Sequence, residues 1–511
     1  MKRDTGVLLS ITSLPSKYGI GCFSQSAYDF VDWLAEAGQK YWQILPLGAT
    51  SHGGSADSPY QAFSAFAGNP YFISLEALIG EGVLTAKECD AIDFGADPAC
   101  VDYEKLYEHR LPLLRKAYER TKLVEDEKYQ AFVNENGWWL DDYALFMAAK
   151  TFFNNQSWTE WPEDLRMHWG FALEYYKEKL SDDIAFHKYM QYKFYEQWTA
   201  LKAYANAKHI DIVGDIPIYV SPDSSDVWAH PDLFQLDEKN SPVQVAGCPP
   251  DNFAVDGQLW GNPIYRWDRH RDTGYDWWCS RMWYSFKLYD VVRIDHFRGF
   301  DEYFAIPAGK TAKDGHWEKG PGMDLFHAIR HRLGDCRVIA EDLGFMTDTV
   351  RQLVKDSGFP NMKVIQFAFD VTDVGGTNEY LPHNYGENCV VYTGTHDNET
   401  IAGWYGGITD KEKQQIRDYL GQQDIADELM YRELNRLALM CSARTCIIPI
   451  QDYLGLGNDS RMNQPGTVGK NWSWRLIPGQ VTKELAAEML TLAKRYGRVN
   501  WDAVNAASKK L

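Results

Sequence analysis

The sequence contains no run of about 18 apolar residues, so none of its segments is long enough to cross a membrane as a helix. It also lacks a signal-peptide pattern, because Met1-Lys2-Arg3 is followed only by a short apolar run that is typical of a strand. No basic stripe is present, and the formal net charge is −19. The positive surface that nucleic acids and phosphate-rich ligands require is therefore missing, whereas neutral ligands are indifferent to this charge.

The spacing of the cysteines argues against a CxxC site and against a zinc site. The nine cysteines are an odd number, and no CxxC motif or Cys/His cluster with zinc-site spacing occurs. We therefore expect free thiols in a reducing cytoplasm. The glycosylation sequon Asn398-Glu399-Thr400 agrees with that location, because it falls in the active site predicted below and a glycan there would block the site.

What the chain does contain is eight short apolar runs rich in β-branched residues. They lie at residues 6–11, 41–47, 210–216, 291–295, 337–342, 362–369, 389–394 and 445–450. Their apolar residues are continuous rather than alternating, which is typical of parallel strands buried on both faces. With helices between them, eight such strands predict an α/β fold of the (β/α)8 TIM-barrel type.

Helical periodicity occurs between several of these runs. Phe30, Trp33 and Leu34 share one face of a predicted helix that stops at Gly38. A similar pattern predicts a helix capped by Thr347 or Asp348 that ends at Gly358. The segment 378–388 contains Pro and Gly, so a loop is expected there instead of a helix.

The spacing of the strands predicts the domain organisation. The whole chain, 1–511, is expected to be one catalytic barrel with no C-terminal β-domain, since little sequence follows the eighth strand and its helix. Residues 50–205 are predicted to be an inserted, mainly helical subdomain after strand two. An insertion after strand three, 221–290, includes the Pro/Gly-rich segment 245–263, which is typical of a substrate loop or lid.

Four carboxylates fall at the ends of predicted strands, on the rim where barrel enzymes carry their active sites. They are Asp215, Asp295, Glu341 and Asp397. Any one of them could equally cap the following helix or lie in a surface loop. Together they point to glycosidic bond cleavage, because crowded carboxyls have divergent pKa values and that reaction needs one carboxylate and one carboxylic acid.

The neighbours of these acids fit the same chemistry. Arg293 lies two residues before Asp295, so both side chains should point to the same face, where a guanidinium favours an ionised nucleophile. A structural ion pair is the alternative for Arg293. His396 precedes Asp397 and either binds sugar hydroxyls or is an ordinary hydrogen-bonded residue. His296 should point to the opposite face and be structural.

Three other chemistries have little support in the sequence. A metal hydrolase is disfavoured because HExxH is absent and the 13 histidines are dispersed. A sugar-phosphate enzyme would carry a glycine-rich phosphate loop near the last two strands, but the glycines at the end of 448–457 precede Asn and Asp rather than a basic or helix-opening segment. A dinucleotide site is disfavoured because no GxGxxG follows the first strand.

Several segments resemble those of alpha-glucan-active barrels. They are VGDIPIYV (213–220), VVRIDHFRGF (291–300), AEDLG (340–344) and THDN (395–398). VAGCPPDNFAVDGQLWGNPIYRW (245–267) and RMNQPGTVGKNWSWR (461–475) narrow the resemblance to amylomaltases, glycoside hydrolase family 77. It covers nearly the whole chain, from LLSITSLPSKYGIG (8–21) to the tryptophans near Trp474.

The resemblance implies roles for individual residues. Asp295 would be the nucleophile, Glu341 the general acid/base and Asp397 the stabiliser of the transition state. Residues expected around the sugar are Arg293, His396, Asp215 and Tyr60 on the donor side, with Ser58, Gln258, Trp260, Asp370 and Asn463 lining it or the acceptor side. Core packing is the alternative for Trp260, whereas the turn that holds Tyr60 favours exposure and stacking.

The resemblance also implies the reaction and the partners. A 4-alpha-glucanotransferase would pass an alpha-1,4-glucan segment from a maltooligosaccharide, starch or glycogen chain to the 4-hydroxyl of glucose or another glucan, by a retaining double displacement. The family uses no metal or organic cofactor. An alpha-glucan hydrolase and a non-catalytic glycan-binding barrel are the alternatives.

Overall fold

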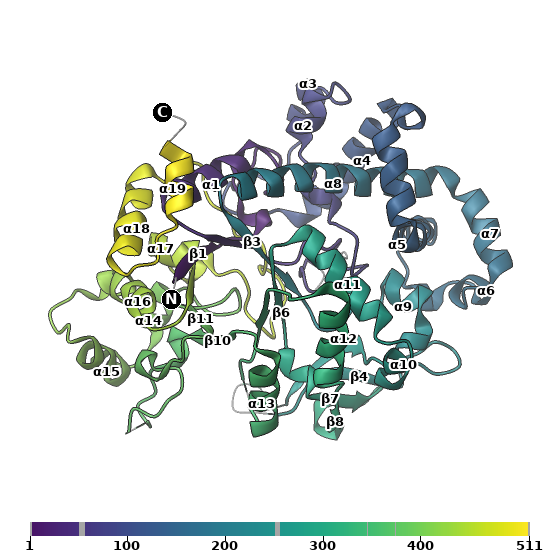
Figure 1. The fold of residues 1–511 in the computed structure, drawn as a ribbon. Coiled ribbons are helices and arrows are strands. Elements are labelled where there is room, and N and C mark those ends of the chain that lie inside the picture. The colour runs from purple at the N-terminus through teal and green to yellow at the C-terminus, as the bar shows by residue number, and fades with distance from the viewer. Residues whose placement is uncertain (1–2, 51–56, 251–255, 345, 374, 509–511) are drawn as a thin grey trace.

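The computed structural model describes residues 3–50, 57–250, 256–344, 346–373 and 375–508. At its centre, eight parallel strands form a closed barrel (Figure 1). In barrel order they are β1 (Asp4–Leu8), β12 (Thr445–Pro449), β11 (Cys389–Tyr392), β10 (Asn361–Val364), β9 (Val338–Ala340), β6 (Val291–Ile294), β3 (Asp211–Ile216) and β2 (Tyr41–Gln43). Each predicted run overlaps one of these strands, so the predicted barrel is confirmed.

The two helices predicted from periodicity are present, with the expected ends. Helix α1 (Gln25–Glu36) buries Phe30, Trp33 and Leu34, and Gly38 follows it with φ of 69°. Helix α13 (Asp348–Ser357) begins at Thr347, whose side chain accepts a hydrogen bond from the backbone N–H of Val350. Between β10 and β11 the described residues contain only the 3-10 turns Ile365–Phe367 and Pro382–Asn384, in agreement with the predicted loop.

Helices fill the connection between β2 and β3. They are α2 (Leu75–Gly80), α3 (Ala86–Asp90), α4 (Tyr103–Arg120), α5 (Glu127–Phe152), α6 (Glu163–Arg166), α7 (Gly170–Lys179) and α8 (Ser181–Ala207). Figure 1 shows α5, α6 and α7 on the side of the barrel away from the C-terminal helices. We keep 50–205 as our proposed limits for an inserted subdomain, although the last helix runs on to Ala207 and leads into β3.

The connection between β3 and β6 contains more regular structure than its composition indicates. Strands β4 (Gln244–Cys248) and β5 (Gln258–Pro263) form an antiparallel pair within the segment predicted to be a loop. They join β7 (Glu302–Pro307) and β8 (His316–Lys319) in a second sheet. The pairing of β4 with β7, which lies after β6 in the chain, explains why local composition did not predict it. The middle of the segment, 251–255, lies outside the described residues. The remaining helices of this connection are α9 (Ser225–Ala229), α10 (Trp267–Asp272) and α11 (Asp276–Leu288).

Helices α17 (Ile450–Leu454), α18 (Lys483–Arg495) and α19 (Trp501–Ser508) follow the last barrel strand, and α18 and α19 pack against α1. The described residues after Pro449 contain no strand. Within the part of the chain that is described, no helix has both the length and the apolar composition needed to span a membrane.

Arg498 lies at the N-terminal ends of the barrel strands β1 and β12. Its side chain is fully buried and donates to five backbone carbonyl oxygens. The acceptors are Leu439, Cys441, Ala443, Arg444 and Asp4, at 2.6–3.2 Å. One guanidinium therefore ties the start of β1 to the connection that enters β12.

Replacing Arg498 by methionine is expected to destabilise the fold by at least about 3 kcal/mol, because it leaves several buried carbonyl oxygens without a donor. The matched control is Arg495→Met, at an exposed position on the preceding helix. Urea midpoints of the two variants and the parent measure the effect. Equal midpoints for the two variants would contradict it.

Candidate active site

A cleft of about 590 Å³ opens at the end of the barrel where the predicted acids lie. It brings together eight of the twelve residues predicted from the sequence. These are Ser58, Tyr60, Gln258, Trp260, Asp295, His396, Asp397 and Asn463. The remaining four are placed individually below.

Arg293 joins two of the acids. Residues Asp215 and Arg293 are register partners on the adjacent strands β3 and β6, and Arg293 Nη1 lies 2.6 Å from Asp215 Oδ2. Its Nη2 lies 3.0 Å from Asp295 Oδ1. Tyr60 Oη also donates to Asp215 Oδ2 at 2.9 Å. The structural ion pair and the contact with Asp295 are therefore both present, and the Asp295 side chain keeps 31% exposure on the cleft.

Glu341 follows β9 and is held by the backbone. Its Oε2 accepts from the N–H of His296 at 2.7 Å, and its Oε1 accepts from the N–H of Leu343 at 2.8 Å. The Glu341 backbone in turn donates to Ile294 O and accepts from Phe297 N. These bonds fix the glutamate beside the segment that carries Asp295.

The two acids Asp295 and Glu341 differ in their pKa values. Burial, together with the charge of Asp295, raises the pKa of Glu341 to about 8. Burial raises the pKa of Asp295 to about 6, against the opposing effect of the Arg293 guanidinium. Because the guanidinium contacts Asp295 directly, the aspartate loses its proton first. Near neutral pH the pair therefore consists of one carboxylate and one carboxylic acid.

Asp397 lies in the segment after β11 and is held by the segment at 461–475. Its Oδ1 accepts from Asn463 Nδ2 at 2.7 Å and lies 3.4 Å from His396 Nε2. Arg461 donates to the backbone oxygens of Asp397 and Asn463, at 2.6 and 2.7 Å. Two segments far apart in the sequence thus present one carboxylate and one amide to the cleft.

Aromatic rings form two walls of the cleft. Tyr60 stacks on His396, with 5.1 Å between ring centroids, and Trp472 packs against both rings. On the other side Trp260 meets the ring of His296 edge-on at 4.8 Å, and its Nε1 donates to Gln258 Oε1. Trp260 lines the cleft and is only half-buried, which disfavours the core-packing alternative.

The expectation that His296 faces away from the site is wrong. Strand β6 ends at Ile294, so strand alternation does not extend to this residue. His296 instead adopts a left-handed conformation, with φ of 53° and ψ of 48°, which turns its N–H toward Glu341 and its ring into the cleft. Burial lowers the pKa of His296 to about 3, so the ring is neutral.

Comparison with known proteins agrees with this geometry. The family model for 4-alpha-glucanotransferase, glycoside hydrolase family 77, matches residues 9–480. A 4-alpha-glucanotransferase of Streptococcus pneumoniae serotype 4 is 49% identical over 99% of both chains. One from Thermus thermophilus is 45% identical over 98% of this chain and 100% of its own. The chain belongs to the 4-alpha-glucanotransferase family.

Solved structures match this family member along its length. An amylomaltase from Streptococcus agalactiae in complex with acarbose has a TM-score of 0.93 and 43% identity, covering 98% of this chain and 100% of its own. An amylomaltase from Corynebacterium glutamicum, at 19% identity and a TM-score of 0.75, shares the fold over 98% of this chain and 75% of its own. As a member of this family, the chain acts on alpha-glucans. Acarbose is bound in the structure of the S. agalactiae protein.

One predicted site residue of this transferase lies elsewhere. Asp370 is exposed, does not line the cleft, and its Oδ1 accepts from the backbone and hydroxyl of Thr372 at 2.8 and 2.7 Å. The strand ends at Val364 and the chain then turns through a 3-10 helix, which carries Asp370 away from the strand end. Asp215, Arg293 and Glu341 are not among the residues that line the cleft; Asp215 and Arg293 are 1% and 3% exposed, and Glu341, the most accessible of the three, is 9% exposed.

Other residues of the transferase cleft were missed from the sequence. Trp472 and Asn471 line it, as does Tyr219. All three lie within segments that carry the family resemblance, 461–475 and 213–220, so those motifs could have identified them. Trp472 adopts φ of 64°, a local feature that the sequence did not indicate. Among the described residues, no group of three His, Cys, Asp or Glu side chains is placed to hold a metal ion.

Proposed function

We propose that the chain transfers alpha-1,4-glucan segments by a retaining double displacement, with Asp295 as nucleophile and Glu341 as general acid/base. The observation that supports these roles is the opposite surroundings of the two acids. The Arg293 guanidinium contacts Asp295 and favours its carboxylate, while burial keeps Glu341 protonated until the pH is about 8. A general acid and a nucleophile are thus present together at neutral pH.

In the first step Glu341 protonates the oxygen of the bond that breaks, and Asp295 Oδ attacks the anomeric carbon. The products are a glucan with a new non-reducing end and a covalent glucosyl ester of Asp295. In the second step Glu341 accepts the proton of an acceptor 4-hydroxyl, whose oxygen displaces Asp295 and restores the starting enzyme. Asp397, oriented by Asn463, stabilises the positive charge that develops on the sugar ring in both steps.

Substrate contacts follow from the walls of the cleft. Tyr60 and His396 would support the donor sugar beside Asp295, and Gln258 and Trp260 would hold the acceptor. Maltooligosaccharides and starch or glycogen chains are the proposed donors, and glucose or a second glucan is the proposed acceptor. Ser58 and Asn463 complete the polar lining, whereas the contribution of Asp370 would require a ligand that extends beyond the cleft.

Hydrolysis is the competing outcome, because water could displace Asp295 by the same chemistry. The strands β4 and β5 place Trp260 over the cleft, where an aromatic face can bind an acceptor and help exclude water. Incubation with maltotriose separates the two activities. A transferase redistributes chain lengths without a matching rise in reducing ends, whereas a hydrolase raises reducing ends in step with product.

Trp260→Ala is expected to raise the ratio of hydrolysis to transfer. The lost stacking should weaken acceptor binding by about 1–3 kcal/mol if it resembles base stacking on aromatic side chains, while formation of the glucosyl-enzyme falls less. Free glucose release and chain redistribution are measured at fixed maltotriose, with and without added glucose. Trp283→Ala, at an exposed tryptophan outside the cleft, is the control. An equal fall in both activities would show that Trp260 has a packing role only.

We also propose a cytoplasmic location. All nine cysteines are free thiols in the structure, six of them buried and three half-buried, which suits a reducing compartment. Fractionation of cells that express the full chain, followed by transferase assay of each fraction, tests this location.

A further inference from the structure

Asp452 is a buried carboxylate that the proposed mechanism does not use. It lies in α17 directly after β12 and is 1% exposed. Its Oδ2 accepts from the hydroxyl of Thr393, and its Oδ1 accepts from the backbone N–H of Ile401 at 2.8 Å. Thr393 directly follows β11, and Ile401 is the first residue of α14 (Ile401–Gly407). One side chain therefore bonds to both ends of the segment between them.

That segment carries two residues of the cleft. Asp397 lies four residues after Thr393 and four residues before Ile401, and His396 precedes it. Neither bond involves the carboxylate of Asp397; one holds the Thr393 side chain and the other the Ile401 backbone, on either side of it. Further along the segment, Gln366 donates to the backbone oxygen of Glu399 at 2.7 Å.

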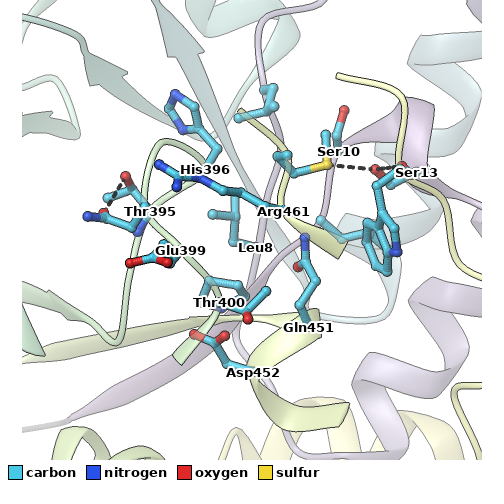
Figure 2. Close-up of a pocket in the computed structure, with 16 residues that line it drawn as sticks. Leu8, Ser10, Ser13, Thr395, His396, Glu399, Thr400, Gln451, Asp452 and Arg461 are labelled. Carbon is cyan, nitrogen blue, oxygen red and sulfur yellow. Dashed lines mark hydrogen bonds between the residues drawn. The ribbon is translucent and has the colours of Figure 1, made fainter. Parts of the chain in front are cut away.

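Behind the segment there is free space. A cavity of about 20 Å³ separates it from β1 and β12, and that volume is enough for one water molecule (Figure 2). Figure 2 shows Asp452 and Gln451 on one side of this cavity and His396 and Arg461 on the other. The segment is therefore not fully packed from behind, and the hydrogen bonds at its two ends add to those that Arg461 and Gln366 donate to its backbone oxygens.

Burying the carboxyl group of Asp452 at this position costs free energy of folding. Burial raises the pKa of Asp452 to about 7, against the opposing effects of its bonds to Thr393 and Ile401. A desolvated acid whose side chain forms two hydrogen bonds with described residues is a poor way to stabilise a fold. The two oxygens of the Asp452 carboxyl can, however, each accept one hydrogen bond. One side chain can therefore bond to two separate donors at the two ends of a loop.

We propose that Asp452 is a positioning residue for the reaction, which holds the segment 394–400 so that Asp397 reaches the transition state in the correct place. The inference rests on the role proposed above for Asp397. Asp452 touches no substrate, so its removal should lower kcat and leave KM nearly unchanged. A displacement of about 1 Å at a reacting group costs on the order of 100-fold in rate.

The first test compares Asp452→Ala, Asp452→Asn and Asp290→Ala. Asp290 is the matched control, because it accepts at 2.8 Å from the N–H of Ile212 and from Asn206 at the opposite end of the barrel strands. We expect kcat to fall about 100-fold in Asp452→Ala. The loss should be under about tenfold in Asp452→Asn, since its amide oxygen can still accept from Ile401 and its NH2 can donate to the Thr393 hydroxyl. Asp290→Ala should keep its kcat.

The second test asks whether Asp452 acts through Asp397. If it does, Asp452→Ala should change the rate by less than about twofold when Asp397 is already asparagine, measured with a glucosyl donor that has a good leaving group. Independent losses that multiply would overturn the proposal, as would full activity of folded Asp452→Ala. If Asp452→Ala does not fold, Thr393→Val removes one of the two bonds and should show a several-fold loss of kcat that disappears in the Asp397→Asn background.

Different results would overturn the role proposed for Asp397 and the role proposed for Asp452. Full activity of Asp397→Asn would remove the role proposed for Asp397 itself. An inactive Asp397→Asn together with a fully active Asp452→Ala or Thr393→Val would leave that role intact and overturn only the positioning role of Asp452.

Discussion

Asp295→Asn is expected to lower kcat by at least about 10⁴-fold, because an amide cannot form the glucosyl ester. The fold should survive, since the amide oxygen can still accept from Arg293 Nη2, which lies 3.0 Å from Asp295 Oδ1 in the parent. Activity is measured by redistribution of maltotriose, and folding by the thermal transition. Asp232→Asn is the matched control, because Asp232 forms an ion pair with Arg269 outside the cleft.

The same position can be tested directly by labelling. A slow fluorinated glucosyl donor should form a stable ester with the parent enzyme, and mass spectrometry of the digested protein should find the label on Asp295. The Asp232→Asn protein should be labelled like the parent, and the Asp295→Asn protein should remain unlabelled. A label on Glu341 or Asp397 would overturn the assignment of the nucleophile.

Glu341→Gln is expected to abolish transfer from maltotriose but to spare donors that carry a good leaving group, because these need no proton from the enzyme. With such a donor the glucosyl-enzyme should accumulate, and added azide should speed turnover, since azide needs no general base. Asp397→Asn should show no rescue, because its loss affects both transition states. Absence of azide rescue in folded Glu341→Gln would contradict the acid/base role.

The pH dependence of the parent follows from the same pair. Activity requires Asp295 ionised and Glu341 protonated, so kcat/KM should rise through a pH of about 6 and fall through a pH of about 8. In Glu341→Gln, assayed with a donor that has a good leaving group, the fall near pH 8 should disappear while the rise near pH 6 remains. A fall that persists in this variant would assign the upper limb to another group.

The sequence predicted the parts of the fold whose cause is local. Eight continuous apolar runs mark the barrel strands, because a parallel strand covered on both faces needs apolar side chains in succession. The ends of α1 and α13 follow from Gly38, Thr347 and Gly358, each of which acts on its own helix. The grouping of the acids at one rim follows in turn from the barrel, once the strands are known.

What the sequence did not predict depends on distant partners or on single backbone angles. Strand β4 exists because it pairs with β7, about sixty residues away, so its own residues carry no clear strand pattern. The direction of His296 depends on one left-handed residue directly after a strand. Asp370 was placed in the site by resemblance alone, whereas the 3-10 turn after β10 carries it elsewhere.

The contacts of Arg498 have a consequence for the order of synthesis. Strand β1 (Asp4–Leu8) leaves the ribosome long before its partner β12 and the guanidinium that ties the two together, which lie at residues 445–449 and 498. At about 5–20 residues per second, one edge of β1 stays without its neighbour for tens of seconds. A nascent chain of this protein must therefore shield an unpaired apolar edge until β12 has been translated, and chains cut short before residue 445 keep that edge open permanently.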